Sequence, residues 1–430
     1  MSRSRTLFKR LLRTLPFVIG LLALGSGALA AQTKWTPNGQ KDFVFGSQVL
    51  LSGGPATGYK PESKLFYTPE GRWWAVLGTS GDGNTAPGVW LYELVDHNWH
   101  PVFQLPGPGA DPWEKADTLF DETTNKLYVA LRDNRYVVGN PRESDLYRLS
   151  YDGSGNWALL SGPTKITTVS IETLTIALDS TGRLWTTFRQ GTLIKVGYTA
   201  PGGTGFTIAT LPGSTPVTSD DISSVTAFGT DATGRKIGLM WSDQVAKRFS
   251  FAWRSDTEPL QTWHIETAYG NGVGDCPTNT SDLCADDHVN LKAFGDQVFA
   301  AVKTSLNDPL NKNPSDPLIV LLQRGADGTW RDYPVSPVSQ NATRPIVLLN
   351  PGGDAINVFA RYRGDIFVWN SSFSAPGFNS AAAVRWTDGP TVDDATSTRQ
   401  VVTGQTGAVV EASSSSQYQY WHNEFLPDAG

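Results

Sequence analysis

Helix-forming stretches are nearly absent from this sequence. Runs of alanine, leucine, glutamate and lysine at helical spacing are rare, whereas the 430 residues include 43 glycines, 27 prolines and 15 tryptophans. Glycine and proline interrupt helices, and aromatic residues favour strands. This composition argues against a helical bundle and predicts an all-β protein, a class that can use this length as one domain.

Cysteine and histidine are scarce as well. The two cysteines, Cys276 and Cys284, lie eight positions apart, and the chain has five histidines. This spacing fits no zinc pattern, because a zinc site needs a second pair of cysteines or histidines. A local disulfide between the two cysteines is the expected state in an oxidising compartment.

The common catalytic and nucleotide-binding motifs are missing too. The sequence contains no G-x-S-x-G, no P-loop, no H-E-x-x-H and no G-x-G-x-x-G after a strand. The hydrolase, nucleotide-binding and metalloprotease classes that depend on these motifs therefore receive no support. The formal net charge of −6 argues against a nucleic-acid partner and against attraction to anionic membranes.

Long apolar stretches are confined to the start of the chain. Basic residues are followed by an apolar stretch from about Phe17 to Leu24 and by the small-residue run Ala28-Leu29-Ala30. This order predicts that residues 1–30 are a signal peptide and that residues 31–430 form one exported domain. An uncleaved membrane anchor is the alternative, although the apolar stretch is short for a span. We therefore expect a secreted or periplasmic protein with no membrane span after cleavage.

Residues 171–213 contain the repeating unit of the chain. Alternating apolar and polar residues, as in Thr173–Leu178 and Leu184–Phe188, are separated by turns rich in glycine, aspartate and proline. This alternation predicts four antiparallel strands in succession. Similar units recur roughly every 50–60 residues, at about 64–106, 117–166, 222–268, 288–335, 344–386 and 398–425. The sequence therefore predicts a seven-bladed β-propeller of four-stranded antiparallel blades.

The last unit, residues 398–425, has only three strands of its own. Residues 42–51, in the amino-terminal part of the mature chain, form a β-like segment that no other blade uses. We expect this segment to pair beside residues 417–425 and to close the ring, which would remove exposed strand edges.

Polar residues recur at one end of the predicted strands. In a propeller, the start of each inner strand and the end of each second strand face the same mouth of the central channel, so these side chains should meet around one axis. The candidate site residues at this mouth are Arg132, Glu172, Arg189, Asp221, Trp241, Asp286, Asp287, His288, Lys303, Arg344 and Arg361.

Two kinds of chemistry fit this set. The arginines could form forks for a carboxylate, sulfate or phosphate. His288 is the candidate general base, because it follows two aspartates and opens an inner strand, and Glu172 and Asp287 are the candidate carboxylate pair. The plainer alternative is that these charges pair only with one another and with water.

No cofactor is expected, with Ca²⁺ as the open alternative. Residues 275–287 include four aspartates, which are ligands that Ca²⁺ prefers. The segment lacks the D-x-[DN]-x-[DN]-G order of the familiar Ca²⁺ loop. The identity of any bound metal is therefore left undetermined.

The repeated hairpins TPEGRWWAVL, DETTNKLYVAL, DSTGRLWTTF and DATGRKIGLM resemble those of secreted seven-bladed β-propellers, in the broad sialidase-like sense. The resemblance covers essentially the whole mature chain and implies an exported propeller. It departs from the sialidase pattern S-x-D-x-G-x-x-W, because Asp179 precedes Gly182 by three positions, and the F/Y-R-I-P run is missing. Sialidase catalysis is therefore not carried over to any residue.

The leading functional hypothesis is binding of a glycan or another extracellular polymer at the polar mouth. A polysaccharide lyase would use His288 as base and Arg189 or Arg361 to neutralise a uronate carboxylate. A glycoside hydrolase would use Glu172 and Asp287, and a structural scaffold would use neither. The oligomeric state is left open by the sequence.

Overall fold

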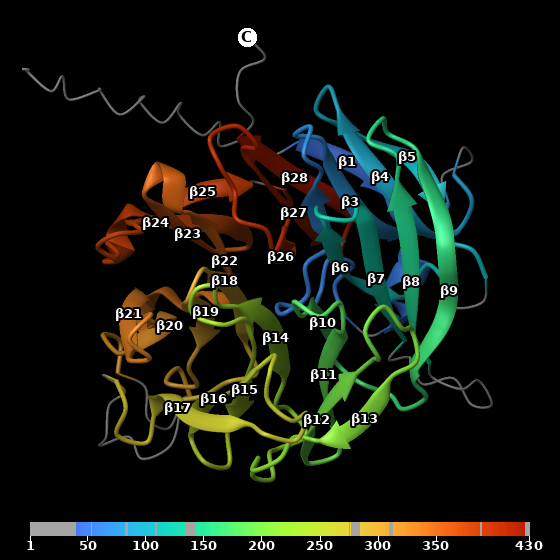
Figure 1. Cartoon of the computed structure of the whole chain (residues 1–430). Helices are drawn as coiled ribbons and strands as arrows, with labels where there is room; N and C mark the ends of the chain where they lie inside the picture. The colour runs from blue at the N-terminus through green and yellow to red at the C-terminus, as the bar shows by residue number, and fades with distance from the viewer. Residues whose placement is uncertain are drawn as a thin grey trace, which may run out of the picture. The chain divides into compact units, whose positions relative to one another are not determined.

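The computed structural model describes residues 40–52, 54–81, 85–107, 110–133, 143–274, 276, 284–308, 313–387 and 389–425. These residues form seven sheets of four antiparallel strands each, arranged in a ring (Figure 1). The only helical turns in this part of the chain are short 3₁₀ segments. The predicted all-β propeller with seven four-stranded blades is thereby confirmed, whereas the predicted signal peptide lies outside the described residues.

In six of the blades, four consecutive strands run from the channel outward. Blades 1 to 3 are formed by β2 (Leu65–Tyr67), β3 (Trp73–Thr79), β4 (Gly88–Val95), β5 (Asn98–Gln104), β6 (Lys115–Asp121), β7 (Lys126–Arg132), β8 (Ser144–Tyr151), β9 (Trp157–Thr167), β10 (Thr175–Leu178), β11 (Leu184–Gln190), β12 (Leu193–Tyr198) and β13 (Thr207–Thr210). Blades 4 to 6 are formed by β14 (Ser223–Phe228), β15 (Lys236–Asp243), β16 (Arg248–Ser255), β17 (His264–Gly270), β18 (Val289–Phe294), β19 (Gln297–Lys303), β20 (Pro317–Arg324), β21 (Trp330–Pro337), β22 (Thr343–Asn350), β23 (Ala355–Tyr362), β24 (Asp365–Ser372) and β25 (Val384–Thr387).

The seventh blade combines strands from both ends of the described chain. It contains β26 (Val392–Thr396), β27 (Ala408–Ser414) and β28 (Gln419–Phe425), and β1 (Gln40–Val44) pairs antiparallel with β28. The sequence placed the amino-terminal strand at residues 42–51, but it ends at Val44 and Ser47–Ser52 form the 3₁₀ helix η1. The expected inner strand from Thr398 onward was also wrong, because β26 ends two residues earlier.

The turn between β10 and β11 explains the D-x-x-G pattern. Asp179 Oδ1 accepts hydrogen bonds from the backbone N–H groups of Thr181 and Arg183, both at 2.9 Å. Its second oxygen accepts from Trp185 Nε1 at 2.8 Å, and Gly182 supplies the positive φ of +78° that the turn requires. One carboxylate therefore fixes both the turn and the orientation of a core tryptophan.

Aromatic side chains pack between neighbouring blades. Trp74 and Trp157 meet edge to face with ring centroids 5.2 Å apart, and Trp185 meets Trp263 in the same way at 5.7 Å. Such pairs contribute about 0.5–1.5 kcal/mol beyond the burial of their area. These tryptophans belong to the core, as expected for most of the tryptophans in the chain.

Cys276 and Cys284 form the predicted disulfide, with their Cα atoms 6.0 Å apart. Within the described residues, no helix has the length and apolar character needed to cross a membrane.

Candidate functional site

The seven inner strands form a ring around the channel. The first strand of each blade contacts the first strand of the next, from β2 through β6, β10, β14, β18 and β22 to β26. Since β1 is the outermost strand of blade 7 and β2 is the innermost strand of blade 1, the chain between them must travel inward across the ring. Residues 56–64, the mouth segment, make the last part of this crossing.

The mouth segment is held by four other blades. Ser63 N–H donates to Asp117 Oδ1 in blade 2 at 2.7 Å, and Asn290 in blade 5 donates to the carbonyl oxygen of Lys60 at 2.6 Å. Further hydrogen bonds join Glu62 to the N–H of Leu174, before blade 3, and Thr57 to Ser413 in blade 7. The segment is largely buried and covers the mouth at which the candidate site residues were expected.

Glu62 is the electrostatic centre of the mouth segment. Its carboxylate pairs with Arg132 Nε and, at 3.0 Å, with Lys64 Nζ, and all three side chains are buried. Burial alone would raise the pKa of Glu62, but Arg132 and Lys64 hold it below its ordinary value. Arg132 also lies over the Tyr59 ring, with its guanidinium carbon 4.6 Å from the ring centroid. Arg132 is therefore buried and paired through Nε, while its Nη1 and Nη2 have no hydrogen-bond partner among the described residues.

His288 lies in a cluster of charges at the start of β18. Its Nδ1 is 2.5 Å from an oxygen of Asp286 and 2.5 Å from an oxygen of Asp287. Its Nε2 is 3.3 Å from Thr343 Oγ1, and the residue is 7% exposed. Both ring nitrogens therefore have partners inside the protein: Nδ1 faces the two aspartates and Nε2 faces the hydroxyl of Thr343.

Two ammonium groups complete this cluster. Lys60 Nζ lies 3.3 Å from Asp287, and Lys303 Nζ pairs with Asp286. Burial would raise the pKa of Asp287, but the charge and hydrogen bond of His288 hold it well below its usual range. Asp286 and Asp287 therefore already have cationic partners, and the other two aspartates of the segment, Asp275 and Asp282, lie outside the described residues.

The remaining arginines of the predicted mouth also have carboxylate partners. Arg361 Nη1 lies 2.8 Å from Asp393, Arg189 lies 3.9 Å from Glu172, and Arg344 pairs with Asp394. The arginine side chains in these pairs are between one sixth and one third exposed. These pairs match the plainer alternative, in which charges at the mouth neutralise one another.

Two predicted residues lie away from the exposed part of the mouth. Asp221 is fully buried and accepts hydrogen bonds from Thr218 and Gln244 in its own blade. Trp241 is 1% exposed and packs in the core between blades 3 and 4. Strand β15 continues to Asp243, which places Trp241 inside the strand and not at its end.

The opposite end of the channel is hollow. Two cavities of about 470 and 310 Å³ share Leu178, Ala227 and Ala293 in their linings, so they form one continuous depression, the channel-end groove. Its lining comes from the ends of β6, β10, β14 and β18 and from Arg399 and Gln400 after β26. Sequence analysis did not identify this groove.

Small residues make room for the channel-end groove. Ala177, Ala227 and Ala293 are each the next-to-last residue of their inner strand, in three successive blades. Repetition of alanine at one blade position is the sequence signal that could have located this site. Phe294 follows Ala293 and is 42% exposed, which gives the groove an accessible aromatic ring.

The polar side chains of the groove are more acidic than basic. Its lining has five acidic and three basic residues: Asp121, Glu122, Asp179, Asp231, Asp256, Arg235, Lys236 and Arg399. Arg399 is itself engaged, since it pairs with Asp117 and donates to the carbonyl oxygen of Ile176. The groove therefore has an apolar floor and no excess of positive charge, and its carboxylates already accept internal hydrogen bonds, as Glu122 does from Gln400 and Asp256 from Ser180.

Another hollow, of about 490 Å³, lies on the loop between β5 and β6, with Pro106, Pro112 and Trp113 in its lining. Residues 108 and 109, within this loop, lie outside the described residues. We base no site on it, because its boundary is only partly described.

No protein-family model matches the sequence, and no curated protein matches it either. The fold is similar to that of several solved propellers. An α-L-arabinanase of Penicillium chrysogenum is 10% identical and aligns over 79% of this chain and all of its own, with a TM-score of 0.46. The Aleuria aurantia lectin, a six-bladed propeller, is 13% identical over 78% of this chain and 99% of its own, with a TM-score of 0.43. An α-L-arabinofuranosidase of Fusarium graminearum is 8% identical over 76% and 93%, with a TM-score of 0.45. These likenesses concern the fold alone.

Proposed function

We propose that this protein binds a neutral glycan in the channel-end groove. The observation that carries the proposal is the contrast between the two ends of the channel. Charges are paired at both ends, but residues 56–64 cover the centre of the predicted mouth, whereas the opposite end holds two cavities. We therefore propose that the ligand binds at the end of the channel opposite the predicted mouth.

The shape and chemistry of the groove favour a sugar. Its two cavities have volumes in the range of small-molecule sites, which is about 300–1,000 Å³. Carboxylate oxygens at the rim can accept hydrogen bonds from sugar hydroxyls, and the exposed ring of Phe294 can pack against the apolar face of a pyranose or furanose. The acidic rim disfavours sulfated and uronate polymers, because like charges repel.

A glycan array carrying neutral and acidic oligosaccharides tests this proposal, followed by calorimetric titration of the tightest binder. We expect binding of neutral glycans and about fivefold weaker binding by Phe294→Ala, since stacking contributes about 1 kcal/mol. Tyr418→Ala is the matched control, because Tyr418 is 40% exposed and is not part of the groove lining. Binding that Phe294→Ala leaves unchanged, or no binding on the array, would contradict the proposal.

Hydrolysis of a glycan at the predicted mouth is the second candidate function. It is favoured by one observation: the charge of Asp287 adds to burial in raising the pKa of Glu172, whereas the pKa of Asp287 itself is lowered. Burial raises the pKa of Glu172, whereas His288 overcomes burial to lower that of Asp287. A raised pKa suits Glu172 to the role of general acid, and a lowered pKa keeps Asp287 ionised. Glycosidases require one carboxyl group of each kind.

Product analysis distinguishes hydrolysis at the predicted mouth from binding in the channel-end groove. Neutral oligosaccharides are incubated with the protein, and the products are separated by chromatography. Hydrolysis lost in Glu172→Gln and kept in Phe294→Ala would support catalysis at the mouth. Oligosaccharides that stay intact after prolonged incubation would exclude hydrolysis and leave glycan binding as the proposed function. The lyase hypothesis is less favoured, because Arg189 and Arg361, its two candidates for a uronate partner, already pair with Glu172 and Asp393.

A further inference from the structure

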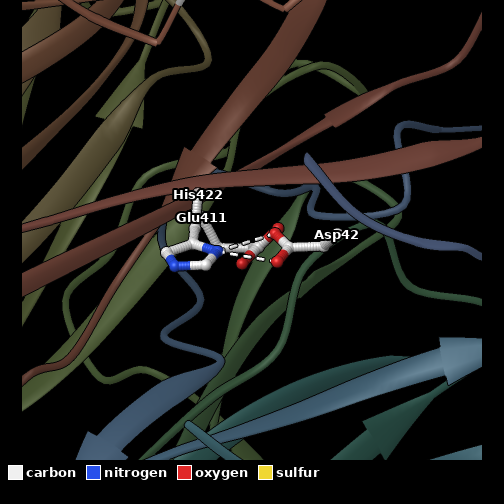
Figure 2. A group of neighbouring side chains, drawn as sticks. All are labelled: Asp42, Glu411 and His422. Carbon is white, nitrogen blue, oxygen red and sulfur yellow. Dashed lines mark hydrogen bonds and ion pairs between the residues drawn. The ribbon is translucent and has the colours of Figure 1, made fainter. Parts of the chain in front are cut away.

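Three ionisable side chains meet inside blade 7, where the amino-terminal strand joins the carboxyl-terminal strands. Asp42 comes from β1, Glu411 from β27 and His422 from β28 (Figure 2). The side chains of Asp42 and His422 are 2% and 0% exposed, and Glu411 is 0% exposed. This cluster is separate from the channel and from both candidate functions.

Strand register brings the three residues together. Glu411 lies directly opposite His422 in the ladder of β27 and β28, so the two side chains project from the same face of the sheet. Gln40 lies opposite His422 on its other side, and the pairing of β1 is irregular between Lys41 and Val44. This irregularity lies at Asp42 and directs its side chain toward His422.

The three side chains offer ligand atoms that face one another. His422 Nδ1 lies 2.8 Å from each oxygen of Asp42, and one ligand atom from each residue lies within 4.8 Å of the other two. Figure 2 shows the carboxylate of Glu411 beside that of Asp42, next to the imidazole ring. Ligands bound to one ion at about 2.0–2.2 Å lie roughly 3 Å apart, so these spacings require little rearrangement.

One oxygen of Glu411 lacks a donor. Glu411 Oε2 accepts a hydrogen bond from Trp99 Nε1 at 2.8 Å, which fixes the orientation of the carboxylate. Glu411 Oε1 is buried and, apart from the carboxylate of Asp42 beside it, meets no hydrogen-bonding side chain among the described residues. A buried carboxylate oxygen that faces a second carboxylate needs either a proton or a cation between them. In the described part of the chain, no lysine or arginine forms an ion pair with either acid.

We propose that Asp42, Glu411 and His422 bind a first-row divalent cation of the Zn²⁺ or Mn²⁺ class. One imidazole nitrogen with two carboxylates is a donor set that suits such ions. Two carboxylates and a neutral imidazole balance the double positive charge, so the buried site is neutral when loaded. Trp99 acts as a positioning residue, since its indole holds Glu411 in place and leaves Oε1 for the cation.

The consequence of this site is a cross-link between distant parts of the chain. The cation would join β1 to β27 and β28, whose residues are separated by about 370 positions in the sequence. Binding only to the folded state stabilises that state by mass action. Metal binding would therefore hold the amino-terminal strand in the last blade.

The test uses tag-free full-length protein dialysed against EDTA and then titrated with ZnCl₂ or MnCl₂ by calorimetry. We expect one equivalent to bind, with the melting temperature rising by about 3 °C at a free metal concentration 100-fold above Kd. Glu411→Gln should lose this binding and this rise while its circular dichroism stays native. Asp287→Asn is the matched control, because it removes a carboxylate from the separate cluster of Asp286, Asp287 and His288.

Two results would overturn the proposal. Wild-type protein that takes up neither ion shows that a shared proton occupies the place between the carboxylates. Uptake that survives in Glu411→Gln and is lost in Asp287→Asn assigns the ion to the cluster around His288. If Glu411→Gln does not fold, His422→Gln replaces it, and the wild-type titration alone decides whether an ion binds.

Discussion

Replacing Glu62 by glutamine tests whether the mouth segment is fixed by buried charge. Glu62 is fully buried and faces two cations, Arg132 and Lys64, while its oxygens also accept from the N–H groups of Tyr59 and Leu174. Glutamine keeps the shape of the side chain and removes the negative charge. The two cations then remain buried without their counter-charge.

The expected loss of stability follows from this geometry. Removing one partner of a buried ion pair costs about 3–5 kcal/mol, because the remaining charge stays desolvated. Unfolding entropy is about 2.1 cal/mol/K per residue, which gives roughly 0.8 kcal/mol/K for the unit of residues 36–430. Glu62→Gln should therefore lower the melting temperature by about 4–6 °C.

Differential scanning calorimetry at pH 7 measures this change. Asp327→Asn is the control, because Asp327 and Arg331 form an ion pair on the surface with about half of each side chain exposed, and its melting temperature should stay close to that of the wild type. Adding Arg132→Met to Glu62→Gln should recover part of the loss, since it removes one unpaired charge. If Glu62→Gln has the same melting temperature as Asp327→Asn, buried charge does not hold the mouth segment in place.

Three further changes have defined outcomes. Burial and the charge of Arg399 lower the pKa of Lys292 to about 7, although Asp117 opposes this shift. Between pH 7 and 10 the unfolded chain therefore carries one more proton at Lys292 than the folded chain, and the free energy of unfolding rises with pH over that window. Lys292→Met should flatten this rise, and melting curves at several pH values check it. Replacing Cys276 and Cys284 by serine should cost roughly 2–3 kcal/mol, measured by urea unfolding, because the disulfide closes a short loop. Deleting residues 40–44 should lower the melting temperature and cause aggregation on size-exclusion chromatography, because β28 becomes an exposed edge. An unchanged elution volume and melting temperature would show that β1 is dispensable.

The architecture could be predicted because it is encoded locally. Alternation with a period of two identifies strands, and turn residues such as Asp179 and Gly182 separate them within a few positions. The repeat length then gives the number of blades. The ends of the strands were less certain, since the β26 segment is short and irregularly paired near Asp393.

The candidate site was harder to predict because it depends on contacts between distant residues. Lys60 and Asp287 are separated by 227 positions, and residues 56–64 show no alternation that would reveal their path across the ring. Trp241 was placed at the mouth because β15 was expected to end there, but the strand continues for two residues. The position of a residue along its strand thus identified the polar residues at the predicted mouth. The path of residues 56–64, which cover them, could not be predicted from the sequence.

The most direct test of the central claim is titration of a neutral oligosaccharide, selected on the array, into the wild type, Phe294→Ala and Glu172→Gln. A ligand in the channel-end groove predicts about fivefold weaker binding for Phe294→Ala and wild-type affinity for Glu172→Gln. Loss of affinity in Glu172→Gln with Phe294→Ala unaffected would place the ligand at the opposite end of the channel and contradict the account.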